Sequence, residues 1–325
     1  IQQEKLNNQV AELDVATSEN SIQESIAQIY IQILYAAESV RVNENTLQVS
    51  IAQRDRGQEL LNAGSIAKSD LAQLEAQVST DRYQLVTAQA TLQDYKLQLK
   101  QLLELDGENE MNIYLPVLSD ENVLLPLPAK KDVYMSALTL RPEIEASKIN
   151  VEASELGIDI AKAGYLPTIS LSAGIGTNHT SGSDFTFGEQ VKNGWNNSIG
   201  VSVSVPIFNN RQTKSAVQKA KLQRETSLLS LLDEQKTLYK TIEGLWLDAN
   251  SAQQRYAAAN EKLKSTQISY DLISEQFDLG MKNTVELLTE KNNLLQAQQE
   301  QLQAKYMAIL NTQLLKFYQG DKLAL

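Results

Sequence analysis

The chain has 325 residues and a formal net charge of -11, and it lacks a basic stripe that could neutralise phosphates, which argues against a nucleic-acid partner. It holds no cysteine and one histidine, His179, so a thiol nucleophile, a disulfide framework and a zinc site made of cysteines or several histidines are excluded within this chain. With 14 glycines, 6 prolines and long stretches of helix-forming residues, the composition predicts a mainly α-helical fold rather than two ordinary globular domains.

The first 105 residues predict a pair of long helices. Between Ile22 and Leu47 the apolar residues recur at alternating spacings of four and three, which indicates a coiled-coil helix over residues 1–61. Gly64 lies where a left-handed cap residue would end that helix, and a second helix is expected to reach about Leu105. Residues 1–105 therefore predict an antiparallel helical hairpin. Because Ile1 lies inside the helical pattern without a cap, we expect the chain to begin within an element.

Residues 106–131 predict an extended connector. Gly107 and three prolines interrupt the helical pattern there, and one small strand is expected near residues 111–115. A helix is expected to resume by Asp132 and to continue to Gly164, with Pro142 beginning a new first turn or making a kink. Residues 132–164 are thus expected to form one helical segment before the next change of pattern.

Residues 165–208 predict a β-hairpin with two different faces. Aliphatic residues alternate with serines and glycines in two runs, 165–177 and 195–208, and the loop 178–194 between them is polar. In each run the aliphatic face extends over roughly the 9 to 11 residues that a tilted strand needs to cross a bilayer, whereas no apolar run is long enough for a transmembrane helix. The same alternation would also suit a ribbon that lies on a soluble core. The residues expected in the transmembrane strands and their aromatic belts are Tyr165, Ile169, Leu171, Trp195, Val201, Val203, Val205 and Phe208.

Residues 209–318 predict a second helical hairpin, followed by a short tail over residues 319–325. A long helix over residues 211–277 carries an unbroken apolar seam from Leu238 to Phe277, and a further helix is expected over residues 284–318. Gly280, in the turn between them, follows Gly64 by 216 positions.

The same offset relates other residues of the two helical hairpins. It aligns Trp246 with Tyr30 and Glu286 with Asp70, which indicates an internal tandem repeat. Shifted back by the same offset, the β-hairpin falls before the first residue. We therefore expect a first β-hairpin upstream of this chain in the natural protein.

Several short motifs, in this order and spacing, carry a family resemblance. They are the run Arg141-Pro142-Glu143-Ile144, the junction Ala163-Gly164-Tyr165-Leu166-Pro167, the exit Val205-Pro206-Ile207-Phe208 and the turns at Gly64 and Gly280. Nearly the whole chain resembles the TolC-like outer membrane efflux proteins. The resemblance implies a trimer in which each protomer gives four strands to one shared barrel, continued by a barrel of helices across the periplasm. It also implies that residues 106–131 and the chain after Tyr318 form a collar around the helices.

Closure of the barrel is also expected on physical grounds. An open four-stranded sheet in lipid would leave unpaired backbone groups along both edges, so it must close with other copies. The number of copies, three, comes only from the resemblance.

A candidate gate lies beside the two helical-hairpin turns. Asp70 and Glu286 occupy matching positions just after the turns, and Lys282 lies near Glu286. The resemblance implies that Glu286 lines a periplasmic constriction and that Asp70, Lys282 and Phe277 occupy latch positions. Alternatively, both acids favour the dipoles at the N-termini of their helices, and the two roles are compatible.

The function that the resemblance implies is a passive exit duct in the outer membrane of a Gram-negative bacterium. A periplasmic adaptor protein would dock near Gly64 and Gly280 and couple a homotrimer of the channel to an inner-membrane transporter, without a cofactor or metal. Two alternatives are a periplasmic coiled-coil scaffold or adaptor without its own channel, and an exit duct for type I protein secretion. An enzyme is disfavoured because the carboxylates lie on solvated helix faces without a histidine partner or a phosphate loop.

Overall fold

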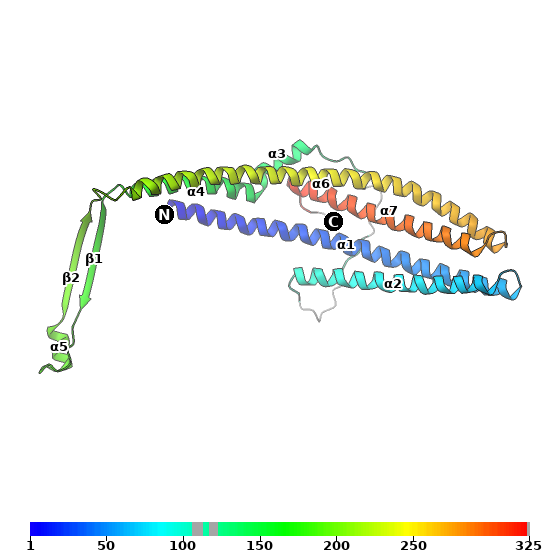
Figure 1. The fold of residues 1–325 in the computed structure, drawn as a ribbon, viewed down its shortest axis with the longest axis horizontal. Helices are drawn as coiled ribbons and strands as arrows, with labels where there is room; N and C mark the ends of the chain where they lie inside the picture. The colour runs from blue at the N-terminus through cyan, green and yellow to red at the C-terminus, as the bar shows by residue number, and fades with distance from the viewer. Residues whose placement is uncertain (106–112, 117–122, 324–325) are drawn as a thin grey trace. The chain divides into compact units, whose positions relative to one another are not determined.

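The computed structural model describes residues 1–105, 113–116 and 123–323, which form long helices and one β-hairpin (Figure 1). The elements are α1 (Gln2–Asn62), α2 (Lys68–Leu102), α3 (Lys130–Leu140), α4 (Pro142–Ala163), β1 (Thr168–Gly176), α5 (Phe187–Asn193), β2 (Asn196–Ser204), α6 (Gln212–Asp278) and α7 (Thr284–Gln319). The chain divides into two compact units, one of Ile1–Glu12 with Glu145–Asp233 and one of Leu13–Ile144 with Glu234–Leu325. The division of the chain into six segments stays a prediction.

The two helical hairpins, α1 with α2 and α6 with α7, form as the sequence predicts. Figure 1 shows both of their turns at the same end of the second unit. Helices α1 and α6 end at Asn62 and Asp278, and helices α2 and α7 begin at Lys68 and Thr284, so both boundaries repeat at the offset of 216 residues. The internal repeat is therefore a repeat of structure as well as of sequence.

The core of the second unit consists of apolar clusters along the helical seams. One cluster joins α1 to α7, and its buried members are Ala27, Ile31, Leu34, Leu302, Tyr306, Leu310 and Leu314. Another joins α3, the start of α4, α6 and α7 around Ile144, Ile242 and Leu315. The seam predicted along α6 is confirmed, since Leu238, Ile242 and Ala249 are buried and Phe277 is buried at its end. Burial of these side chains removes apolar surface from water and holds the long helices together.

The described parts of the connector are anchored to two aromatic side chains at equivalent positions of the repeat. Tyr30 Oη donates a hydrogen bond of 2.8 Å to the carbonyl of Tyr114, and Trp246 Nε1 donates one of 3.1 Å to the carbonyl of Pro128. The small strand expected at residues 111–115 is not found at positions 113–115, and residues 111 and 112 lie outside the described part of the chain. Pro116, which follows the segment directly, opposes strand pairing there because proline lacks a backbone N–H.

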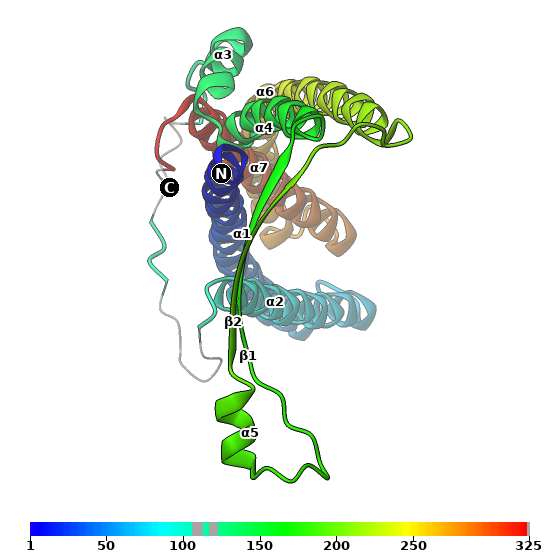
Figure 2. The same cartoon turned by 90° about the vertical axis from the view of Figure 1, so that its left-hand side faces the viewer.

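The helical segment predicted over residues 132–164 consists of two helices, with the new first turn at Pro142 that was one of the two expected forms. Helix α3 begins at Lys130, slightly earlier than expected, and α4 begins at Pro142 after the extended residue Arg141. A proline at the first helical position costs no hydrogen bond, because that N–H has no acceptor within its helix. Helix α3 packs against α7 (Figure 2).

The β-hairpin belongs to the first unit and forms a two-stranded antiparallel ribbon (Figure 2). In its register Leu171 faces Val201 and Ile169 faces Val203, while Ser170 faces Ser202 on the other side of the ribbon. The aliphatic side chains are exposed, from 61% for Val203 to 82% for Ile199. The predicted separation into an aliphatic face and a face of small polar residues is confirmed.

The strands are shorter than predicted, and four of the expected strand and belt residues lie outside them. Tyr165 lies in the turn after α4, Trp195 lies just before β2, and Val205 and Phe208 follow its end. Pro167 and Pro206 flank the paired region, and neither can donate a hydrogen bond to a β-ladder. Val205 therefore has no pairing partner in the ribbon, and its place in a transmembrane strand stays a prediction.

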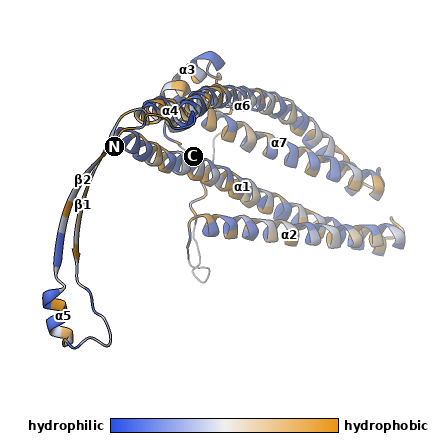
Figure 3. Ribbon diagram, turned by 60° about the vertical axis from the view of Figure 1, so that its left-hand side comes forward, coloured by the Kyte–Doolittle hydropathy of each residue, from blue (hydrophilic) through white to orange (hydrophobic). Residues whose placement is uncertain are grey.

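The loop between the strands contains a helix that the sequence analysis missed. Thr186 precedes α5, and its N–H and hydroxyl both donate to the carboxylate of Glu189, at 2.9 and 2.8 Å. This is one half of a capping box, and its Thr-x-x-Glu pattern is visible in the sequence. Figure 3 shows hydrophobic and hydrophilic residues mixed along the long helices, and none of the described helices is long and apolar enough to span a bilayer.

Burial of Tyr306 predicts a loss of stability at alkaline pH. Burial raises the pKa of Tyr306 to about 12, and the nearby Glu38 adds to the rise. Its contribution to stability is fully present below pH 10, where the unfolded tyrosine is also neutral, and is lost as the pH rises towards 12. Between pH 9 and pH 11 the free energy of unfolding should fall by about 1 kcal/mol more than in Tyr306→Phe. Urea titrations at both pH values measure this difference.

The matched control for that measurement is Tyr83→Phe. Tyr83 is 74% exposed, so this variant removes a tyrosine hydroxyl that the fold does not bury. Equal pH dependence in Tyr306→Phe and the wild-type chain would show that the buried phenol does not control alkaline stability.

Candidate functional site

The turns of the two helical hairpins have the same backbone conformation. Gly64 has φ +72° and Gly280 has φ +73°, the left-handed region that glycine adopts without steric cost. Ser65 N–H donates to the carbonyl of Leu60 at 2.8 Å, and Met281 N–H donates to that of Gln276 at 2.8 Å. These are Schellman bonds, which satisfy the last carbonyls of a helix.

The two predicted gate acids lie directly after these turns, and both cap their own helices. Asp70 Oδ2 accepts a hydrogen bond of 3.0 Å from the N–H of Ala67, and Glu286 Oε2 accepts one of 3.2 Å from the N–H of Asn283. The side chain of Asn283 in turn accepts from the N–H of Glu286 at 2.9 Å. The role of both acids at helix N-termini is therefore observed, while their role in a constriction stays a proposal.

Lys282 and Glu286 form a partly exposed ion pair beside the second turn. Lys282 Nζ donates to Glu286 Oε1 at 2.5 Å, and the two side chains are 32% and 40% exposed. The hydrogen bond from Lys282, followed by that from the N–H of Asn283, lowers the pKa of Glu286. Glu286 is thus ionised at neutral pH and keeps an accessible charge at the end of the helical hairpin.

Phe277, which the resemblance places at a latch position, lies in an apolar cluster within its own chain. It is 2% exposed and packs with Leu60, Leu74 and Leu287, so that α1, α2, α6 and α7 meet around it. The structure brings Glu286 and Lys282 together and places Phe277 in the core behind them. This placement favours a packing role for the phenyl ring.

A buried polar cluster beyond the turns was missed by the sequence analysis. Lys291 on α7 forms an ion pair with Asp81 on α2, and both contact Ser50 on α1. The sequence does carry a signal for this cluster. Val78 follows Leu74 by four positions and Asp81 follows Val78 by three, so Asp81 is a charged residue at a position of the apolar seam. Charged residues on long helices usually lie on the solvated face, and for that reason these two were not singled out.

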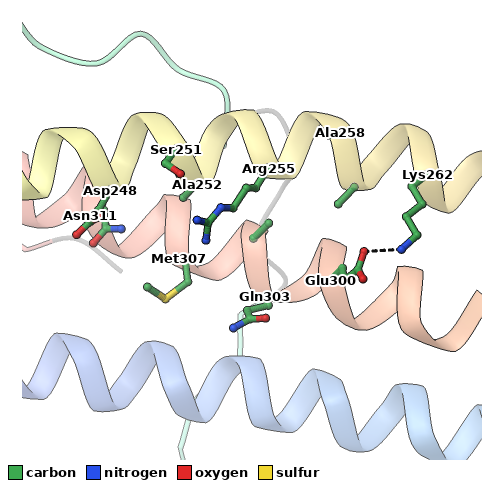
Figure 4. A pocket seen from close by; sticks show the side chains of 12 residues that line it. Asp248, Ser251, Ala252, Arg255, Ala258, Lys262, Glu300, Gln303, Met307 and Asn311 are labelled. Carbon is green, nitrogen blue, oxygen red and sulfur yellow. Dashed lines mark hydrogen bonds and ion pairs between the residues drawn. The ribbon is translucent and has the colours of Figure 1, made fainter.

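A cleft of about 540 Å³ lies between α6 and α7 in the second unit. Figure 4 shows Arg255 and Lys262 on α6 extending toward α7, which contributes Glu300 and Met307 to the lining. Lys262 Nζ donates to Glu300 Oε2 at 2.8 Å. Among the described residues no group of three or more His, Cys, Asp or Glu side chains could hold a metal ion.

The chain matches the model of a family described as outer membrane efflux protein over residues 133–320, which is more than half of its length. It is 25% identical over 294 residues to the outer membrane efflux protein BepC of Brucella suis biovar 1 (strain 1330), covering 90% of this chain and 61% of BepC. It is 23% identical over 313 residues to the outer membrane protein TolC of Escherichia coli (strain K12), covering 93% of this chain and 62% of TolC.

The fold is similar to that of the outer membrane protein VceC from Vibrio cholerae, with a TM-score of 0.78 and 17% identity, covering 99% of this chain and 75% of VceC. The chain thus spans less than two thirds of the length of BepC and TolC. The relatives are outer membrane proteins of Gram-negative bacteria. On the evidence of the family match, the relatives and the fold, this chain belongs to the outer membrane efflux protein family.

Proposed function

We propose that this chain forms part of a passive exit duct, the outer membrane channel of a tripartite efflux pump. The observation that carries the proposal is the β-hairpin, whose aliphatic face is exposed along nine-residue strands. A tilted strand crosses a bilayer with about 9 to 11 residues, so the length suits a lipid-facing strand. No bond is made or broken in this function, and the energy for transport comes from a partner.

The exposure of both faces opposes the alternative of a ribbon that packs on a soluble core. Along the described hairpin, the other face carries small residues such as Ser170 and Ser202, which are also exposed. Large apolar side chains on one face and small polar ones on the other suit a barrel wall with lipid outside and water inside.

The free edges of the hairpin support assembly with further copies. Among the residues that the structure describes, β1 and β2 pair only with each other, which leaves one unpaired edge on each strand. Unpaired backbone groups are costly in a bilayer, so the ribbon must join other strands to close a barrel. We propose a homotrimer as the closed assembly, in line with the family resemblance.

The turns of the helical hairpins supply a candidate docking surface for a periplasmic adaptor protein. Around Gly280 the apolar side chains of Leu279, Met281 and Val285 are 73%, 64% and 58% exposed. Exposed apolar side chains grouped at one end of a helical hairpin favour contact with another protein. The adaptor would connect the duct to an inner-membrane transporter, which hands over the substrate.

The acids beside the turns would make the entrance of the duct selective for cations. Asp70 and Glu286 recur in each copy of a trimer, and a ring of carboxylates attracts cations and repels anions. The ion pair with Lys282 would hold each Glu286 side chain in place at the constriction.

Single-channel conductance of the complete protein in a planar bilayer tests the duct and the gate together. The wild type should show small cation-selective openings, and Glu286→Ala combined with Asp70→Ala should show larger openings with weaker cation selectivity. Glu261→Ala is the matched control, because Glu261 pairs with Lys264 within α6 and away from the turns. Unchanged openings in the double variant would remove the gate assignment and leave the duct.

The rival function, a periplasmic coiled-coil scaffold, has a distinct outcome in the same experiment. It predicts no conductance from protein that has inserted correctly in the bilayer. That result would overturn the proposed duct.

A further inference from the structure

The buried cluster of Lys291, Asp81 and Ser50 joins the two helical hairpins within one chain. The three residues are 3%, 1% and 2% exposed and come from α7, α2 and α1. Lys291 Nζ donates to Asp81 Oδ2 and to Ser50 Oγ, and the hydroxyl of Ser50 donates to Asp81 Oδ2. Gln77 Nε2 donates to the other carboxylate oxygen of Asp81 at 2.9 Å. Both oxygens of the buried carboxylate therefore have partners.

A buried ion pair of this kind contributes little net stability. Burial lowers the pKa of Lys291, and the hydrogen bond and charge of Asp81 oppose that shift. The free energy lost when two charges leave water is about as large as the free energy gained from their attraction. Well-packed apolar residues at the same positions often give a similar stability. Stability alone does not explain why the seam carries charges here.

A buried ion pair can specify the axial register of one helix against another, whereas an apolar seam cannot. Lys291 lies between Leu287 and Leu294 at spacings of four and three, so all three occupy the seam of α7. Apolar contacts have no direction, and a shift by one helical turn brings other apolar seam residues into contact. A charged pair loses its partner in any other register. A cavity of about 110 Å³ lies beside Lys291, so the lysine side chain has room to move when a shift of register separates it from Asp81.

We propose that Lys291, Asp81 and Ser50 form a lock that fixes the axial register of α7 against α1 and α2. The lock sets the distance between the turns at Gly64 and Gly280. Its existence is independent of transport. Only its consequence for the width of the duct's periplasmic end rests on the proposed function.

Pulsed electron–electron double resonance measures the distance between the two turns directly. The chain has no cysteine, and Ser65 and Met281 are both exposed, so Ser65→Cys with Met281→Cys gives two specific spin labels. The full chain is measured in detergent micelles with an excess of unlabelled protein, so that an assembly carries one labelled copy.

The decisive variant is Asp81→Leu combined with Lys291→Met, which leaves no unpaired charge in the seam. We expect it to melt within a few degrees of the wild type and to show a second distance population, displaced by about 5 Å, one helical turn. Lys291→Met alone should show the same second population with a lower melting temperature. The control Lys282→Met breaks an exposed pair and should keep the single wild-type distance.

A single wild-type distance in the folded double variant would overturn the lock, because contacts outside the cluster would then fix the register. The result does not depend on conductance. A lock that fails leaves the proposed duct intact, and a duct that fails in the bilayer leaves the distance measurement unaffected.

Discussion

Arg141→Met is expected to lower the free energy of unfolding of the second unit by about 3 kcal/mol, a typical cost of breaking a buried ion pair. The guanidinium pairs with Glu143 at 2.7 Å and with Glu24 at 3.2 Å, and the arginine side chain is 9% exposed. Removing it leaves two carboxylates without their cation. Since these carboxylates are 19% and 21% exposed, water relieves part of the penalty, and we expect the lower end of the range.

The same guanidinium also contacts aromatic rings at the C-terminal end of α7. It lies 4.3 Å from the ring centroid of Tyr318 and 5.6 Å from that of Phe317, positions that allow cation–π attraction. Arg141→Lys keeps the charge and loses the planar guanidinium group. Its free energy of unfolding should therefore lie between that of the wild type and that of Arg141→Met.

Arg224→Met is the matched control for Arg141. Arg224 also pairs with two glutamates, Glu155 and Glu225, but it is 34% exposed and its partners are more exposed still. Exposed ion pairs contribute little, so we expect hardly any change. Denaturant unfolding followed by circular dichroism compares the variants. Equal losses for Arg141→Met and Arg224→Met would refute the structural role assigned to Arg141.

Val201→Lys is expected to lower the stability of the membrane-inserted protein by about 2–4 kcal/mol, the cost of a lysine on the lipid face of a barrel near the bilayer midplane. Val201 faces Leu171 near the middle of the paired region and is 68% exposed on the aliphatic face. The cost arises because the ammonium group loses its hydration in the hydrocarbon layer.

The neighbouring position gives a control that differs only in the face of the ribbon. Ser202 faces Ser170, and in the proposed barrel its side chain points to water, so Ser202→Lys should cost little. Urea titration of the complete protein in lipid vesicles compares the two variants. Should both substitutions prove equally costly, the assignment of the two faces to lipid and water would be wrong.

The long helices could be predicted from the sequence because strong local signals mark their ends. Gly64 and Gly280 end two helices in left-handed caps, and Pro142 begins a third, so chain-local chemistry decides these boundaries. The second strand was predicted too long, because the alternation of Val205 and Ile207 continues past Pro206 while the backbone pairing ends at Ser204. The helix after Thr186 was missed because glycine and polar residues dominate the loop around it.

The positions of the candidate site residues could be predicted from the sequence, but their contacts could not. The matching positions of Asp70 and Glu286 were visible through the repeat, whereas their hydrogen bonds to backbone N–H groups depend on local geometry. The contact of Lys291 with Asp81 links residues 210 positions apart, and no local pattern carries such a pairing. Long-range polar contacts of this kind need the fold before they can be assigned.

The anchoring of the connector bears on how the two halves of the repeat could diverge. Tyr30 and Trp246 differ in ring, in size and in donor atom, yet each donates to a main-chain carbonyl. Every residue has a backbone carbonyl, whatever its side chain. The contact therefore requires only a side-chain donor that is long enough to reach that carbonyl. Such a contact tolerates substitution of the donor residue by another donor and of the acceptor residue by any other residue. The two halves of the repeat can therefore keep the same contact at a position where their side chains differ.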